Sequence, residues 1–281
     1  MSIISVNSLS FRYSYSDRYI LKDISFSIDE KEFVLLAGAS GCGKTTLARA
    51  LVGLIPQFYE GEYNGEVRIL GMDPATTPIS KITSQVGFLF QNPENQIFMT
   101  TVERDIAFSL EFRGFSREEM RERVAWAMKI MGISHLASKR IEELSGGEKQ
   151  KVALAGILAL KPKILILDEP TAYLSPMSAR ELMSMLKWLN AKLGITILLI
   201  DHRLDLAVEV AQRILVMKEG ELHIDLPIKE AFKHDLSKEY GVNVPTLIKI
   251  LDVIRRQGFS LEPPPLTVDE FIDLIKMRRA I

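Results

Sequence analysis

Residues 38–45 read Gly38-Ala39-Ser40-Gly41-Cys42-Gly43-Lys44-Thr45 and match the pattern GxxxxGK[ST] completely. The stretch follows a short apolar run, Phe33–Ala37, and precedes a helical pattern. The glycines let successive backbone N–H groups turn inward, and a helix N-terminus adds positive potential. The sequence therefore predicts a strand–loop–helix cradle for phosphate groups, in which Lys44 neutralises the β- and γ-phosphates and the Thr45 hydroxyl ligates Mg²⁺.

A second apolar run, Ile164–Leu167, ends in two acids, Asp168 and Glu169. Four consecutive apolar residues predict a strand buried on both faces, and the carboxyl ends of such strands are where α/β sheets bind ligands. We expect Asp168 to hold the water shell of Mg²⁺ and Glu169 to orient or deprotonate an attacking water. Alone, the pair could equally be a charged exit from a strand, and the cradle favours the functional interpretation.

Strand-like and helical runs alternate along the rest of the chain. The expected strands are Val67–Leu70, Val86–Phe90, Ile195–Ile200 and Ile214–Met217. The expected helices carry Leu47, Leu51 and Leu54 up to Pro56, Ser116–Met131 with a Ser116/Glu119 capping box, and Val152–Leu160. This alternation predicts an α/β fold with a mostly parallel sheet, preceded by a β-rich segment over residues 1 to about 35.

From about residue 226 the pattern becomes helical. Pro245–Gln257 places an apolar stripe on one face and stops at Gly258, and a Pro263–Pro265 linker follows. A last helix opens with a Thr267/Glu270 capping box and a Leu266–Phe271 hydrophobic staple. We expect residues 226–281 to form a small helical appendage that adds dimer contacts.

Bulk composition limits the partners and the compartment. The formal net charge is −1, so no overall positive field favours nucleic acid. A single cysteine, Cys42, rules out an intrachain disulfide and fits a reducing compartment. The N-terminus lacks a signal-peptide pattern, and the most apolar stretch, Val152–Leu167, is interrupted at Lys161–Lys163. We therefore expect a cytoplasmic chain that reaches a membrane only through a partner.

The stretch Leu144–Gln150, LSGGEKQ, precedes the predicted helix at Val152–Leu160. Ser145 and Glu148 have capping-box spacing, so a well-capped helix would explain it. A glycine-exposed helix N-terminus is also an anion site. Together with the two motifs that flank it, this stretch resembles the signature LSGGQ of the ATP-binding-cassette (ABC) ATPases, with glutamate in place of the usual glutamine.

The resemblance implies a P-loop fold: residues 1–225 form the nucleotide-binding domain, with an N-terminal antiparallel β subdomain and a helical signature subdomain at about 92–160. It also implies a sandwich dimer, in which the signature of one subunit meets the MgATP of the other. The nucleotide-contacting residues it implies are Tyr13, Gly38, Ala39, Ser40, Gly41, Cys42, Gly43, Lys44, Thr45, Thr46, Gln91, Ser145, Gly146, Gly147 and Glu148. The implied metal ligands are Thr45, Gln91 and Asp168, and the implied catalytic groups are Glu169, His202, Gln91 and Lys44.

Some of these assignments have alternatives. Tyr15 could replace Tyr13 as the aromatic that stacks on adenine, and either could be ordinary strand packing. On its own, His202 would more often be a hydrogen-bonded loop histidine than a catalytic one. Alkylation of Cys42, inside the cradle, is expected to block ATP binding sterically.

One residue departs from the family pattern. Thr171-Ala172-Tyr173-Leu174-Ser175-Pro176 carries serine where the family usually has aspartate. Serine keeps the helix cap, with Pro176 at the first helical position, but loses a charge at the dimer interface. Because the two sites of such a dimer need not be equal, we expect a heterodimer whose partner subunit carries the aspartate, and a homodimer is the alternative.

The stretch Phe90-Gln91-Asn92-Pro93-Glu94-Asn95-Gln96-Ile97-Phe98, with Asp105-Ile106-Ala107-Phe108, resembles the energy-coupling-factor (ECF) ATPases of cobalt and vitamin uptake. That resemblance implies a second ATPase, a transmembrane coupling protein and a small substrate-binding membrane protein, with the chain on the cytoplasmic face of the membrane. The alternatives are a soluble ABC ATPase that acts on ribosomes or DNA, and a non-hydrolysing, ATP-gated dimerisation module. The transported substrate is not encoded in this chain's motifs.

Overall fold

The computed structural model describes residues 2–256 and 264–279. Its central sheet has six strands in the order β5-β6-β7-β3-β8-β9. The first five are parallel and β9 pairs antiparallel with β8. The bounds are β5 Val86–Leu89, β6 Ile164–Asp168, β7 Thr196–Ile200, β3 Phe33–Gly38, β8 Arg213–Lys218 and β9 Glu221–Pro227. The predicted parallel core is confirmed, and its apolar strands are buried on both faces.

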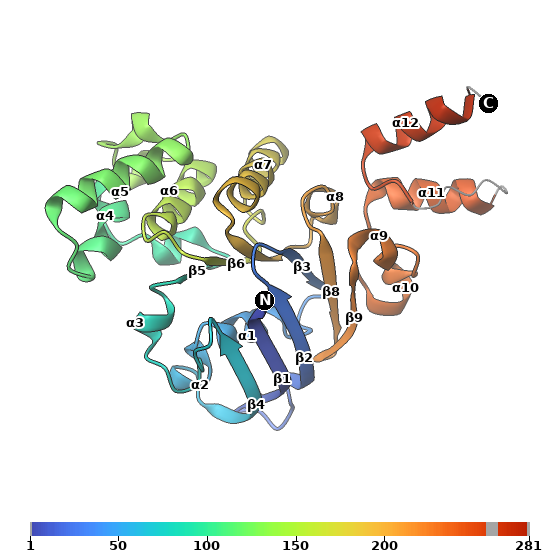
Figure 1. Cartoon of the computed structure of the whole chain (residues 1–281), viewed down its shortest axis with the longest axis horizontal. Helices are drawn as coiled ribbons and strands as arrows, with labels where there is room; N and C mark the ends of the chain where they lie inside the picture. The colour runs from blue at the N-terminus through green and yellow to red at the C-terminus, as the bar shows by residue number, and fades with distance from the viewer. Residues whose placement is uncertain (1, 257–263, 280–281) are drawn as a thin grey trace.

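A second, antiparallel sheet lies below the first in Figure 1, in the order β2-β1-β4. Its strands are β1 Ser2–Tyr13, β2 Leu21–Asp29 and β4 Gly61–Ile69. Strand β2 alternates buried and exposed residues, as expected for a sheet with one face on the core and one in water. The β-rich N-terminal segment is therefore confirmed.

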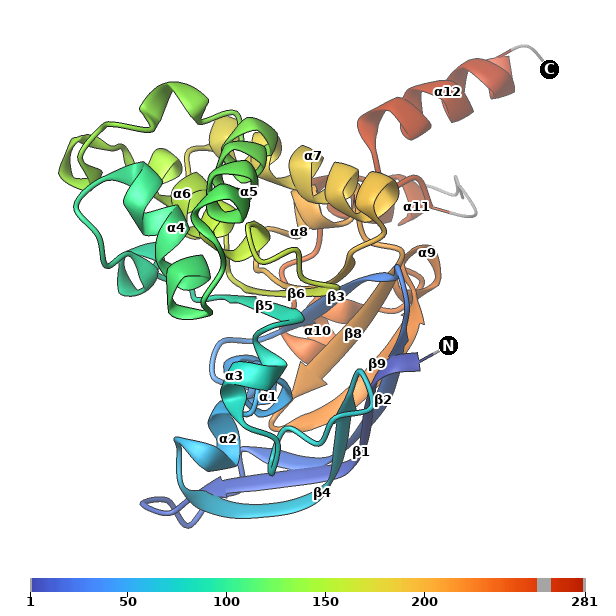
Figure 2. The same ribbon diagram turned by 60° about the vertical axis from the view of Figure 1, so that its left-hand side comes forward.

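Fifteen α- and 3₁₀-helices surround the sheets in the described residues. They are α1 Lys44–Leu51, α2 Leu54–Gln57, α3 Ile79–Ile82, η1 Pro93–Gln96, α4 Val102–Phe112, α5 Arg117–Ile130, η2 Ser134–Leu136, η3 Ile141–Glu143, α6 Gly146–Leu158, α7 Pro176–Leu193, α8 Leu204–Ala207, α9 Ile228–Ala231, α10 Leu236–Tyr240, α11 Thr246–Arg256 and α12 Val268–Arg279. Figures 1 and 2 both show α4, α5 and α6 gathered in one lobe, on the far side of β5 from the antiparallel sheet.

The central sheet separates two hydrophobic cores, and β3 contributes to both. Phe33 and Leu35 join the core that includes the helical lobe and α7. Val34 and Leu36 join the core that includes α1 and the antiparallel sheet. Successive side chains of a strand point to opposite faces, so one six-residue strand connects both halves of the molecule. The position of the C-terminal end of β3 therefore determines the position of the cradle.

One expected element end needs correction. The helix after the cradle stops at Leu51, because Gly53 takes a left-handed φ of 80° and Leu54 begins the separate helix α2. The expected domain boundary at residue 225 falls inside β9, which pairs with β8 as far as Pro227. The predicted end of α11 at Gln257 and Gly258, and the start of the proline linker, lie outside the described residues.

The C-terminal helices share the main core. Ala231, Leu236, Ile248 and Leu266 are buried in the same cluster as the helical lobe. The Thr267 hydroxyl accepts from Glu270 N at 3.1 Å, as a capping residue should, whereas the Glu270 carboxylate accepts from Leu266 N rather than from Thr267 N. The tail is thus attached to the nucleotide-binding domain by apolar packing rather than being a core of its own.

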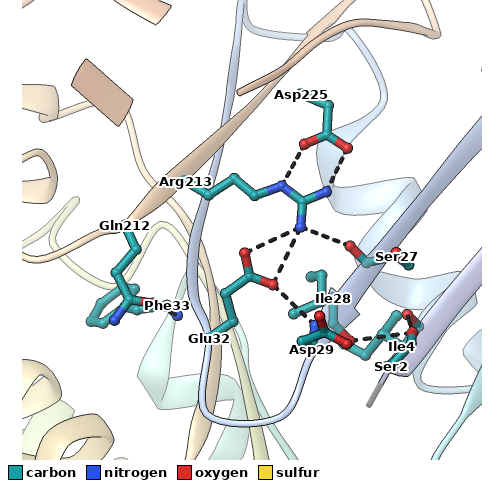
Figure 3. A network of polar contacts seen from close by, with 10 residues as sticks. All are labelled: Ser2, Ile4, Ser27, Ile28, Asp29, Glu32, Phe33, Gln212, Arg213 and Asp225. Carbon is teal, nitrogen blue, oxygen red and sulfur yellow. Dashed lines mark hydrogen bonds and ion pairs between the residues drawn. The ribbon is translucent and has the colours of Figure 1, made fainter. Parts of the chain in front are cut away.

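Arg213 of β8 joins the two sheets, as Figure 3 shows. Its guanidinium pairs with both carboxylate oxygens of Asp225, and its Nη1 donates to Glu32 at 3.1 and 3.2 Å and to Ser27 O at 3.0 Å. The hydrogen bond to Asp225 is the main reason that the pKa of Arg213 is raised, and Glu32 adds to it. One side chain therefore holds β9, the β2–β3 turn and β2 together.

We expect Arg213→Met to lower the free energy of unfolding by about 2 kcal/mol, because it leaves two carboxylates without their cation, although solvent screens the pairs in part. Arg68→Met removes an exposed pair with Glu66 and should cost less than about 0.5 kcal/mol. Urea unfolding of both variants checks this difference, and equal costs would mean that Arg213 is not a structural joint.

Candidate active site

The cradle lies between β3 and α1, as predicted. Gly38 has a φ of 150°, and a Cβ there would lie 2.3 Å from the carbonyl oxygen of Met217, so only glycine fits. Lys44 is 5% exposed, and its Nζ donates to Gly38 O at 2.8 Å and to Ala39 O at 2.9 Å. The ammonium group is thus held inside the curve of the loop.

Cys42 is also in this loop, and it is 4% exposed. Its Sγ lies 3.8 Å from Lys44 Nζ. An alkyl group on this sulfur has no room beside the lysine, so the expected loss of ATP binding on alkylation has a steric cause. Mass spectrometry and nucleotide titration of the same sample would check it, and a fully alkylated protein that binds ATP normally would contradict it.

Asp168 ends β6 beside the cradle and is 3% exposed. Its Oδ1 is buried and has no hydrogen-bond partner among the described residues. Burial raises the pKa of Asp168, and a hydrogen bond with Thr45 opposes the rise. A buried, unpaired carboxylate oxygen next to a hydroxyl is a donor set that suits Mg²⁺.

Glu169 lies at the meeting point of three loops. Gln91 Nε2 donates to its Oε2 at 2.8 Å, and His202 Nε2 lies 2.8 Å from its Oε1. The φ of Glu169 is 50°, and its backbone N–H donates to Ile200 O at 2.8 Å, which fixes the turn after β6. The structure therefore brings Gln91, Glu169 and His202 together from three separate segments, as the motifs require.

The signature begins α6. Ser145 caps the helix, and Glu148 Oε2 accepts from Ser145 N at 2.8 Å and from Ser145 Oγ at 2.7 Å. The capping box is confirmed, so the Glu148 carboxylate stabilises the N-terminus of α6. Ser145 and Gly146 are exposed. They lie in the helical lobe, whereas the cradle borders the other core, so one chain does not bring these two motifs together.

The two candidate aromatics differ sharply in exposure. Tyr13 is 9% exposed, and its hydroxyl lies 3.3 Å from Thr46 Oγ1. Tyr15 is 83% exposed and stacks on Tyr13 with ring centroids 5.2 Å apart. Tyr15 covers one face of the Tyr13 ring, so Tyr15 is the more accessible of the two rings in this structure.

The residues that fix the segments carrying His202 and Gln91 were not predicted from the sequence as site residues. Asp201 is 3% exposed, accepts from Thr171 Oγ1 and from Arg203 N, each at 2.7 Å, and so fixes the turn that carries His202. The available signal was a second acid after a buried strand, directly before the histidine. Gln96 completes the edge strand β5: it accepts from Phe90 N at 2.9 Å and donates to Phe88 O at 2.8 Å.

Asp105 holds the next part of the same loop. It is 8% exposed, and its Oδ1 accepts from Phe98 N at 2.8 Å and from Met99 N at 3.0 Å. Burial raises the pKa of Asp105. The folded state therefore binds this proton more tightly than the unfolded state, and the ionised carboxylate costs stability at neutral pH.

We expect Asp105→Asn to keep the acceptor oxygen and to stay within about 1 kcal/mol of wild type, whereas Asp105→Ala costs about 1–3 kcal/mol by orphaning two N–H groups. As the pH falls from neutral toward the ordinary aspartate pKa of about 4, wild type should gain stability relative to Asp105→Asn. Urea unfolding across that range checks both points, and a shift in the opposite direction would contradict this account.

A family model for ABC transporters matches residues 21–172. The chain belongs to the ABC transporter family, and it is an ATPase that hydrolyses ATP. One relative is the energy-coupling factor transporter ATP-binding protein EcfA2 of Caldanaerobacter subterraneus subsp. tengcongensis, 40% identical over 95% of this chain and 94% of the relative.

Solved structures agree with this assignment. The cbiO1 protein from Clostridium perfringens, described as part of the ABC transporter complex cbiONQ, has a TM-score of 0.76, is 32% identical, and covers 89% of this chain and 99% of its own. The ATP-binding cassette MJ0796, solved as a dimer in a post-hydrolysis state with ADP and Pi, has a TM-score of 0.69 and 28% identity over 80% of this chain and 98% of its own.

Proposed function

We propose that this chain is an ATPase subunit of an energy-coupling-factor transporter that takes up a vitamin, a metal ion or a similar micronutrient. The observation that carries the catalytic part is the convergence of Gln91 and His202 on Glu169, beside the cradle. The transporter type is supported by the EcfA2 relative, by the cbiO1 neighbour and by the stretch from Gln91 to Gln96.

The site residues divide the chemistry between them. Lys44 neutralises the β- and γ-phosphates of ATP from inside the loop. Glu169 accepts a hydrogen bond or a proton from the attacking water, and Gln91 holds that carboxylate and helps to orient the water. His202 donates toward the charge that develops on the γ-phosphate. Gln91 and His202 each contact a different oxygen of Glu169. The carboxylate that would activate water is therefore already oriented before ATP binds.

Asp168 and Thr45 would hold Mg²⁺, with Gln91 as the third group implied by the family pattern. The unpaired Oδ1 of Asp168 supports this assignment. When bound, the ion would supply positive charge to the phosphate oxygens. Tyr13 is proposed to stack on the adenine base, and Tyr15, whose exposed ring covers one face of Tyr13, is the alternative.

The functional unit is proposed to be a dimer. The exposed signature residues and the cradle lie in different lobes, so a second subunit has to supply the missing half of each site. The MJ0796 dimer supports this arrangement. Ser175 caps α7 through Ser178 N at 3.2 Å, so serine fulfils the structural part of the missing aspartate's role. The lost charge favours a heterodimer with a related ATPase, and the tail helices are proposed to add contacts to it.

The membrane partner is proposed to dock beside η1. An apolar cleft there runs between α2, β5 and α6 and is lined by Leu54, Phe88, Phe90 and Ile157. Phe98, two residues after the cleft-lining Gln96, is 69% exposed. Among the described residues, no helix is long and apolar enough to span a bilayer. We therefore propose a peripheral location on the cytoplasmic face, reached through a transmembrane coupling protein and a small substrate-binding membrane protein.

The test is mild-detergent purification of the tagged chain from membranes, followed by identification of the co-purified chains. We expect a second, related ATPase and two hydrophobic proteins. Recovery only as a soluble homodimer, or with ribosomes or DNA, would overturn the transporter assignment and leave the ATPase assignment in place.

A further inference from the structure

Two neighbouring loops of the site are joined by two side chains to which the proposed mechanism gives no role. One loop lies between β6 and α7, and the other lies between β7 and α8 and carries His202. Asp201 Oδ2 accepts a hydrogen bond from Thr171 Oγ1 at 2.7 Å. Arg203 Nη1 donates to Leu174 O at 3.1 Å. The residues on both sides of His202 therefore bond to the loop that follows β6.

The two bonds differ in their surroundings. Asp201 and Thr171 are 3% and 0% exposed, so their bond is closed off from water. Arg203 is half-buried, and Leu174, whose carbonyl oxygen it contacts, is buried. A hydrogen bond from a cation is about twice as strong as one between neutral groups. The Arg203 bond is therefore a substantial link between the loops despite its partial exposure.

Together with His202, these contacts close a ring. His202 Nε2 lies 2.8 Å from Glu169 Oε1. Glu169 begins the loop after β6, and Ala172 N donates to Glu169 O at 3.1 Å, so the loop starts with a tight turn. Leu174 lies two residues further on, and its carbonyl oxygen accepts from Arg203, the neighbour of His202 in the sequence. A shift of one loop relative to the other therefore breaks the Arg203 bond and moves His202 away from Glu169.

The side chain of His202 needs such support because it is 40% exposed. Ordering an exposed side chain during a reaction costs free energy, and this cost falls when neighbouring groups already hold its backbone in place. Asp201 holds the residue before His202 through Thr171, and Arg203 holds the residue after it through Leu174. The backbone of His202 is thereby fixed from both directions.

We propose that Arg203 is a positioning residue for ATP hydrolysis: it bonds the loop that follows Glu169 to the loop that carries His202, and so keeps His202 aimed at Glu169. This inference rests on the proposed roles of Glu169 and His202. Arg203 acts only through other residues, so its loss should slow the chemical step and leave ATP binding unchanged.

The test is steady-state ATP hydrolysis by the purified chain with Mg²⁺. Arg203→Met keeps the length of the side chain and removes its cation, whereas Arg203→Lys keeps a cationic donor. We expect Arg203→Met to lower kcat about tenfold, as the loss of one charged hydrogen bond would, with KM within about twofold of wild type. Arg203→Lys should stay within about threefold of the wild-type kcat. Arg180→Met is the matched control, because Arg180 is exposed and lines the same cavity as Arg203 from α7, and it should leave kcat unchanged.

A double variant asks whether Arg203 acts through His202. In a His202→Ala background, Arg203→Met should lower kcat no further, because the group that it positions is gone. If Arg203→Met does not fold, Arg203→Gln, which keeps an N–H donor without the charge, takes its place in both comparisons.

Three results would overturn the inference: independent losses in the double variant, an equal loss in Arg180→Met, or a loss that vanishes when the rate is expressed per bound ATP, which would show unfolding alone. The proposed function would fail in a different way. In that case His202→Ala and Glu169→Gln would each hydrolyse ATP at the wild-type rate.

Discussion

In the purified chain without partner subunits, Glu169→Gln is expected to lower phosphate release by about 10²–10⁴-fold, while ATP binding changes by less than about threefold. The amide keeps the size of the side chain and one acceptor for Gln91 Nε2, but it cannot take a proton from water. Because ATP then stays bound, the ATP-loaded dimer should accumulate. Phosphate release measured by a coupled assay, nucleotide titration and size-exclusion chromatography check the three parts of this prediction.

The chain offers a matched control at Glu219. This residue is exposed, lies in the β8–β9 turn and has a φ of 51°, close to the 50° of Glu169. Glu219→Gln therefore makes the same chemical change in the same backbone conformation, on an exposed side chain outside the predicted site residues, and should leave the rate unchanged. If Glu169→Gln retained more than a tenth of the wild-type rate, Glu169 would not be the group that activates water.

Gly38→Ala is the second large effect. The new methyl group would lie 2.3 Å from Met217 O and 2.7 Å from Cys42 Sγ. Met217 is paired with Gly38 across β3 and β8, so its backbone cannot withdraw without breaking the sheet. We expect a loss of about 2–4 kcal/mol in the free energy of unfolding, from overpacking and from the positive φ, and a fall of at least about tenfold in ATP affinity.

Gly114→Ala separates the cost of a positive φ from the cost of the close approach to Met217 and Cys42. Gly114 has a φ of 76°, and a Cβ there meets nothing within 4 Å. This change should therefore cost only the backbone term, about 1 kcal/mol, and leave ATP affinity unaltered. Urea unfolding and nucleotide titration of both variants make the comparison. Equal effects at the two glycines would show that the close approach at Gly38 is not what requires a glycine.

The parts of the site predicted correctly depend on local sequence. The cradle, the carboxylate pair and the capping boxes at Ser116 and Ser145 each lie within a few residues of one another, so their spacing alone determines their geometry. Gln91 and His202 were predicted through the family resemblance, and the fold brings both to Glu169 because parallel strands end at the same edge of the sheet.

The parts missed depend on contacts between distant segments. Tyr13 and Tyr15 are two residues apart, and the burial of Tyr13 beside exposed Tyr15 follows from contacts with other segments, those with Thr46 and Tyr59 among them. The joint at Arg213 connects residues nearly two hundred positions apart, from Ser27 to Asp225. The shared core of the tail likewise depends on apolar side chains whose partners lie in other elements, which no local spacing reveals.

The most direct test of the account is phosphate release by the membrane complex captured with this chain, prepared in parallel with wild type and with Glu169→Gln. The account predicts that hydrophobic partners co-purify in both preparations and that the rate falls by at least half in the variant, since one of two sites is lost. An unchanged rate, or capture of the chain without any membrane protein, would contradict it.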